Sequence, residues 1–125
     1  MQLEPVAQGP RHAIYALAHG GRCQAIRFLS DLEKSDLNLT HAIAQRLRSI
    51  ANEGIPSYNE TVSRKVSDHC YELKVGRARL FWFYWTVSDR PAIIITHGWL
   101  KGPDKEQQRQ IAAAERLFVE YTQTR

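Results

Sequence analysis

Residues 71–101 constrain the fold more than any other part of this sequence, because their hydrophobic pattern is that of extended chain. In residues 71–75 apolar side chains alternate with charged ones, which is typical of a strand with one buried face. Residues 80–85 follow Arg79 and include five consecutive aromatic residues, and residues 92–96 are rich in β-branched side chains. The segment therefore predicts three antiparallel strands joined by short turns.

Helical spacing of apolar residues precedes these strands. Residues 23–32 carry a large apolar side chain at every third position. Residues 39–51 repeat at intervals of three and four, after Asn38 as a candidate N-cap and before a stop at residues 54–56. A short apolar run at residues 12–17 predicts one earlier strand. The first half of the chain is thus predicted to contain one strand and two consecutive helices.

A last helix is predicted after the three strands. Asp104 is its candidate N-cap, and Gln107 takes the reciprocal position of a capping box. Its buried face is marked by Ile111, Ala114, Phe118 and Tyr121. The whole pattern predicts one α+β domain over residues 1–125, with a small, mainly antiparallel sheet, an N-terminal helical hairpin and a C-terminal helix.

Composition and short motifs argue against several classes of protein. An apolar fraction of 43% over 125 residues suits a single core. No apolar run approaches the roughly 20 residues that span a bilayer, and no signal peptide is recognisable, so we expect neither a membrane span nor export. Cys23 and Cys70 are expected to be reduced thiols in the cytoplasm. The spacing of histidines and cysteines matches no metal motif, and no phosphate-binding loop occurs, so neither a metal nor a cofactor is expected.

Positive charge is concentrated in the second half of the chain. The formal net charge is +4, and residues 61–125 hold eleven lysines and arginines against seven acidic residues. Such a surface attracts a phosphate-rich partner or an acidic protein, and salt weakens that attraction. The same charge is also compatible with solubility alone.

Cationic and proton-transferring side chains gather on the predicted strands. Lys74 lies on the first strand, Arg79 begins the second, and His97 and Lys101 follow the third. Antiparallel pairing would bring them into one patch. Such a patch suits metal-free cleavage of RNA, in which a 2′-hydroxyl attacks the neighbouring phosphate and a fixed guanidinium stabilises the charge that develops.

Structural roles explain the same residues equally well. Lys74 is compatible with a solvent-facing position on an alternating strand, and Arg79 with an ion pair to Glu72. His97 precedes a glycine at a strand end and fits a hydrogen-bonded turn histidine. The aromatic run favours a central strand covered on both faces over an exposed platform for RNA bases.

Three linked stretches resemble a known family. The sequence Cys70-Tyr-Glu-Leu-Lys-Val75, followed by Gly76-Arg-Ala-Arg-Leu-Phe-Trp82 and by Ile93-Ile-Ile-Thr-His-Gly-Trp-Leu-Lys101, is similar to the phage-derived RelE/HigB-like branch of the RelE/ParE superfamily. The order of predicted elements also matches this branch over most of the chain. The resemblance implies a RelE-like fold and a type II toxin that cleaves mRNA, commonly on the ribosome. A cognate antitoxin, usually a helix-turn-helix protein, would neutralise it.

The resemblance also implies roles for individual residues. Arg79 matches the strand arginine that contacts the scissile phosphate, and His97 and Lys101 match the catalytic positions after the last strand. The basic residues of the substrate-binding set are Lys74, Arg77 and Lys105. The general base stays open between Glu72, His97 and Tyr121.

Two departures from the branch bear on the activity. Glu72 replaces a second basic residue, and Gly102 stands where another lysine is common. A non-enzymatic toxin of the ParE kind, which binds a protein such as DNA gyrase, is therefore an alternative, because the fold alone does not determine function. A plain RNA-binding module is a third.

Overall fold

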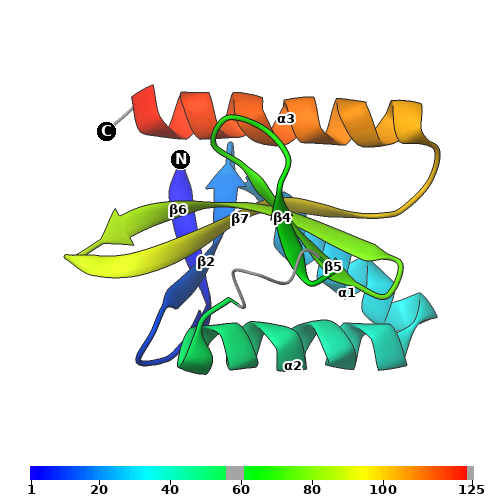
Figure 1. Ribbon diagram of the computed structural model, residues 1–125, viewed down its shortest axis with the longest axis horizontal. Coiled ribbons are helices and arrows are strands. Elements are labelled where there is room, and N and C mark those ends of the chain that lie inside the picture. The colour runs from blue at the N-terminus through cyan, green and yellow to red at the C-terminus, as the bar shows by residue number, and fades with distance from the viewer. Residues whose placement is uncertain (56–60, 124–125) are drawn as a thin grey trace.

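The computed structural model describes residues 1–55 and 61–123 and has three layers, with one sheet between helices (Figure 1). Helices α1 (Gln24–Ser35) and α2 (Leu37–Glu53) cover one face of the sheet, and α3 (Asp104–Gln123) covers the other. No helix in the described residues is both long and apolar enough to cross a bilayer.

The sheet contains strands from both ends of the chain. Its strands are β1 (Gln2–Gln8), β2 (Ala13–His19), β3 (Arg22–Cys23), β4 (Ser63–Lys65), β5 (Tyr71–Val75), β6 (Ala78–Val87) and β7 (Arg90–Leu100). Their order is β1-β2-β7-β6-β5-β4, and β3 pairs with β2 outside this path. Pairing is antiparallel except between β2 and β7, which are parallel. The prediction of an α+β fold with a mainly antiparallel sheet is confirmed.

The predicted N-terminal helical hairpin is wrong in its position. Strands β1, β2 and β3 come first, and the two helices follow them. The sequence indicated β2 but neither β1 nor β3. Strand β1 is an edge strand that contains Pro5 and Glu4, so it lacks the apolar alternation that marks a half-buried strand. Its hydrogen bonds come from β2, which local pattern does not reveal.

Two predicted helix caps also differ. Asp36, not Asn38, caps α2, because its Oδ1 accepts a hydrogen bond from the backbone N–H of Leu39 at 3.0 Å. Asp104 is the first residue of α3 rather than its cap, since the Pro103 carbonyl already accepts the Gln107 amide at 3.1 Å. The predicted end of α2 is confirmed at Gly54, whose φ of 90° suits glycine. The rest of the predicted stop, from residue 56 onward, lies outside the described residues.

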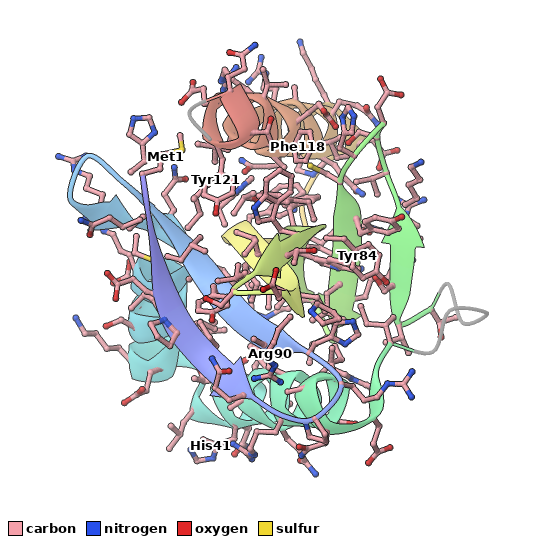
Figure 2. The ribbon with its side chains drawn as sticks, turned by 90° about the vertical axis from the view of Figure 1, so that its left-hand side faces the viewer. Met1, His41, Tyr84, Arg90, Phe118 and Tyr121 are labelled. Carbon is pink, nitrogen blue, oxygen red and sulfur yellow. The ribbon has the colours of Figure 1, made fainter. Side chains whose placement is uncertain are left out.

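The aromatic strand is buried on both faces over residues 80–83, as its sequence predicted, whereas Tyr84 is 47% exposed. Leu80 and Trp82 of β6 pack toward α1 and α2, while Phe81 and Phe83 pack toward α3. All four are at most 2% exposed. Figure 2 shows Phe118 and Tyr121 pointing from α3 toward the sheet to complete the second core.

Candidate functional site

The register of β5, β6 and β7 places the predicted site residues in two rows across the sheet. Lys74 pairs with Arg79, which pairs with Trp99. Two residues further along, Glu72 and His97 both pair with one phenylalanine of β6. Since side chains alternate along a strand, both rows point to the face that α3 covers. The sheet therefore brings Lys74, Arg79 and His97 to one face, as the sequence predicted.

Glu72 is a buried carboxylate with partners on both oxygens. Its side chain is 0% exposed. Oε1 lies 3.3 Å from Arg64 Nε and 3.9 Å from Arg79 Nε, and Oε2 accepts a hydrogen bond from Gln107 Nε2 at 2.9 Å. A buried charge is tolerated only when it is paired in this way. Glu72 thus positions Arg79, and its oxygens are occupied in this arrangement.

Arg79 is held at the root of the β5–β6 turn. Its side chain is 11% exposed, and Nη1 donates to the carbonyl oxygens of Gly76 at 2.7 Å and Ala78 at 2.9 Å. With Nε facing Glu72, the guanidinium has a fixed orientation. Nη2 makes no hydrogen bond with the described part of the chain.

His97 is enclosed beneath the first turns of α3. It is 5% exposed, its Nε2 lies 2.9 Å from Gln110 Oε1, and its Nδ1 lies 3.1 Å from Thr96 Oγ1. Gln110 Nε2 donates to Glu106 Oε1 at 3.0 Å, which turns the amide oxygen toward the imidazole and assigns the proton to Nε2. Burial lowers the pKa of His97, against the opposing hydrogen bond from Gln110. The ring is therefore neutral near pH 7.

Exposed cations surround this end of the sheet. The Lys101 amide donates to the Arg77 carbonyl at 2.8 Å, so the end of β7 and the β5–β6 turn lie side by side. Arg77 Nη2 also lies 3.4 Å from Asp36 Oδ2, while Lys101, Lys105 and Arg64 are exposed. These side chains and Lys74 form what we call the cationic end. Its composition suits contact with phosphate groups.

Comparison with known proteins gives one family. The sequence model of the family described as "Phage derived protein Gp49-like (DUF891)" matches residues 28–119, about three quarters of the chain. This chain is a member of the Gp49-like family. No significant match was found among curated proteins.

Tyr121 of this Gp49-like protein lies away from the cationic end. It is 3% exposed and packs in the core against Phe83 and Trp85, with ring centroids 5.8 and 5.6 Å away. It follows Gln107 by 14 residues in one helix, which corresponds to about 21 Å along the axis. The predicted site residues are thus not all brought together, because Tyr121 is separated from the part of α3 that contacts Glu72.

Sequence reasoning missed the residues that hold this site in place. Arg64 was missed because β4 was not predicted, and Gln110 lies beside the predicted buried stripe of α3. Gln107 was assigned to capping, yet it precedes Ile111 by four residues and Ala114 by seven, so helical phase places it on the buried face. A buried glutamine on that face was the signal of a polar partner on the sheet.

A second polar cluster in the Gp49-like chain joins the turn before β5 to α3. Glu115 Oε1 accepts hydrogen bonds from Ser67 Oγ at 2.7 Å and from the His69 amide at 3.0 Å, and Oε2 lies 2.7 Å from His69 Nδ1. The His69 ring stacks on Phe118 at 4.2 Å. Burial alone would raise the pKa of Glu115, but these hydrogen bonds outweigh it and the pKa is lowered. The cluster fastens α3 over the sheet.

The described residues contain no group of three or more metal-ligating side chains. Both cysteines are free thiols. Burial, together with the nearby Glu115 carboxylate, raises the pKa of Cys70 to about 12, so this thiol is not ionised near neutral pH.

Proposed function

We propose that this Gp49-like protein is the toxin of a type II toxin–antitoxin system and inhibits translation in the cytoplasm by metal-independent cleavage of mRNA on the ribosome. Membership of the phage-derived Gp49-like family supports the toxin part of this proposal. The observation that carries the proposal is the pairing of Lys74 with an immobilised Arg79, surrounded by exposed Arg77, Lys101 and Lys105. A fixed guanidinium among mobile cations suits a phosphodiester whose charge increases during the reaction.

The proposed reaction is intramolecular transfer within the RNA. The 2′-hydroxyl gives up its proton to the general base and its oxygen attacks phosphorus, while the bond from phosphorus to the 5′-oxygen breaks. The leaving 5′-oxygen takes a proton from water, so the products are a 2′,3′-cyclic phosphate and a 5′-hydroxyl. Arg79 binds the phosphate through Nη2, and Lys74, Arg77, Lys101 and Lys105 hold the neighbouring phosphates.

His97 is the proposed general base. If the Gln110 side chain turns away, the imidazole proton moves to Nδ1. There it is donated to Thr96 Oγ1, whose own proton is donated to the Phe81 carbonyl at 3.2 Å. Nε2 then presents a lone pair to the 2′-hydroxyl. A positioned base of this kind contributes about 10² to 10⁴-fold to the rate.

The test is a reconstituted translation reaction in which mRNA 3′ ends are mapped. We expect new ends within translated codons, and a loss of at least tenfold in cleavage with Lys74→Gln or with His97→Asn. Arg116→Gln is the matched control, because Arg116 is an exposed arginine on α3 outside the cationic end, and it should cleave like the wild type. In a separate reaction without ribosomes, adding EDTA to remove free divalent ions should leave any cleavage of naked RNA unchanged.

A second function is favoured by one specific observation. Both oxygens of Glu72 and both nitrogens of His97 are occupied by hydrogen-bond or ion-pair partners. A toxin that only binds needs no free base, so the chain would then act in the ParE manner on a protein such as DNA gyrase. Intact mRNA together with gyrase-dependent DNA breaks would replace the nuclease proposal with this one.

Both proposals include a cognate antitoxin of the helix-turn-helix type. The test is to express the toxin alone and together with each small helix-turn-helix protein encoded next to its gene, where one is present. The cognate antitoxin should restore growth and co-purify with the toxin. A toxin that arrests growth equally with and without that protein would contradict this part of the proposal.

A further inference from the structure

A groove runs between the edge strand β1 and helix α2, on the face of the sheet opposite α3. Its volume is about 380 Å³. It is lined by Val6, Ala7, Gln8, Leu29, Thr40, Ala44, Leu47, Arg48 and Asn52. The α2 residues span Thr40 to Asn52, which corresponds to about 18 Å along the helix axis. That length matches about three turns of a second helix.

The floor of the groove is apolar, and the charged side chain among its lining residues is that of an arginine. None of the lining residues is acidic, and Arg48 is exposed at the rim. Helix α2 carries Arg46, Arg48 and His41 along its length, and its carboxylates lie at its two ends, in the cap Asp36 and the last residue Glu53. Figure 2 shows His41 on the outer side of α2, pointing away from the sheet. The outer surface of α2 is therefore complementary to a negatively charged partner with aliphatic side chains.

A hollow on the other flank of α2 has the same character. It is lined by Ala42, Gln45, Arg46, Ser49 and Val75, again without a carboxylate. Helix α2 thus stands as a ridge with an arginine in the hollow on each side. A nucleic acid would use the arginines but not the aliphatic floor beside Leu47, and this favours a peptide.

Strand addition to β1 is disfavoured as the mode of binding. Pro5 has no N–H to donate, and the register between Pro5 and Ala7 is interrupted by a bulge. Both features are known to protect a sheet edge from further pairing. A helix that inserts side chains into the groove avoids this edge, because it needs no backbone hydrogen bonds from β1.

We propose that the groove between β1 and α2 binds an acidic amphipathic helix of a partner protein. Leucine-like residues at every third and fourth position fill the groove, and glutamates or aspartates on the flanks meet Arg48 and Arg46. This inference rests on the proposed function, under which the helix belongs to the antitoxin. Since α2 and α3 lie on opposite faces of the sheet (Figure 1), the partner is held without direct contact with Arg79.

The experiment selects random 16-residue peptides displayed on phage against the immobilised full chain. The peptides recovered should be acidic and should carry large aliphatic residues at helical spacing. Their affinities are then measured by fluorescence anisotropy for wild type and variants. We expect Arg48→Glu to weaken binding about tenfold or more, because it replaces an attraction by a repulsion. Ala44→Trp, which fills the groove, should weaken it at least as much.

Arg116→Glu is the matched control, because it reverses an equally exposed arginine on the opposite layer, and it should change affinity less than twofold. Peptides without acidic bias, or peptides that bind the Arg48→Glu variant like the wild type, would overturn the inference. Binding of a 12-nucleotide RNA that Arg48→Glu abolishes would also overturn the inference, because it would show that the arginines of α2 bind phosphate groups. Arg48→Glu should retain mRNA cleavage while it loses peptide binding. Loss of cleavage in the wild type would contradict the nuclease proposal, whereas unchanged peptide binding by Arg48→Glu would contradict this one.

Discussion

Replacing Arg79 by alanine tests whether the cluster beneath α3 is held by charge pairing. The change removes one of the two arginines that face the buried Glu72 carboxylate and also frees the Gly76 and Ala78 carbonyls. Breaking a buried ion pair by removing one partner costs about 3 to 5 kcal/mol. Arg64 remains 3.3 Å from Glu72, although its own side chain is 42% exposed, so we expect the lower end, about 3 kcal/mol.

The double variant Arg79→Ala/Glu72→Gln distinguishes charge from packing. If the loss in Arg79→Ala comes from the uncompensated carboxylate, neutralising Glu72 should recover about 2 kcal/mol in that background. The single change Glu72→Gln should itself destabilise the protein, because it leaves Arg79 buried beside an amide. The two mutations should therefore be strongly non-additive, with a coupling energy of roughly 2 kcal/mol or more.

Urea unfolding followed by tryptophan fluorescence measures all four proteins of this cycle. A loss of about 3 kcal/mol in a domain of this size also corresponds to a fall in Tm of roughly 10 °C. Arg79→Ala within 1 kcal/mol of wild type, or strictly additive effects, would refute the reasoning about Glu72. Arg116→Ala controls for the loss of an exposed arginine and should shift stability by less than about 0.5 kcal/mol.

Three further predictions concern other parts of the chain. Gly9→Ala should destabilise by about 3 kcal/mol in thermal unfolding, because a Cβ there would overlap the backbone carbonyl oxygen of Ala51 near the end of α2. Gly102→Ala, which meets only ordinary contacts, should be near neutral. Cys70 should resist iodoacetamide at pH 8 in the native state, while the less buried Cys23 reacts first, and equal rates would contradict the raised thiol pKa. The folded pKa of Glu115 is lowered, so its stabilising contribution is present above about pH 4.5 and is lost as the pH falls through the folded pKa. In Glu115→Gln, the free energy of unfolding should therefore depend less steeply on pH in that acid range.

Much of the central sheet could be predicted from the sequence, and the reason is visible in β6 and β5. The apolar run in residues 80–83 reports directly which side chains must leave water. Alternation in residues 71–75 identified the strand, but it did not indicate that Glu72 is buried as well, because α3 covers the second face. Strand β4 is short and exposed on two of its three residues, so nothing in its own pattern distinguishes it from a loop. It exists because β5 offers it a hydrogen-bonding edge.

The members of the candidate site were predicted, together with one of their contacts. Lys74, Arg79 and His97 share a face, as antiparallel pairing implies, and the expected ion pair of Arg79 with Glu72 is present at 3.9 Å. The partners on α3 were not predictable in the same way, because Gln107 meets Glu72 from 35 residues away only after α3 has docked on the sheet.

The sequence by itself determined the strands at residues 71–101, the helices on either side and the positive charge of the second half, since hydrophobic period and charge are local properties of the chain. The tertiary structure decided the parallel pairing of β2 with β7, the burial of Glu72 between Arg64, Arg79 and Gln107, and the enclosure of His97 by Gln110. These depend on register and helix docking, which bring together groups far apart in the chain. Each buried polar group then requires a partner that only this packing supplies.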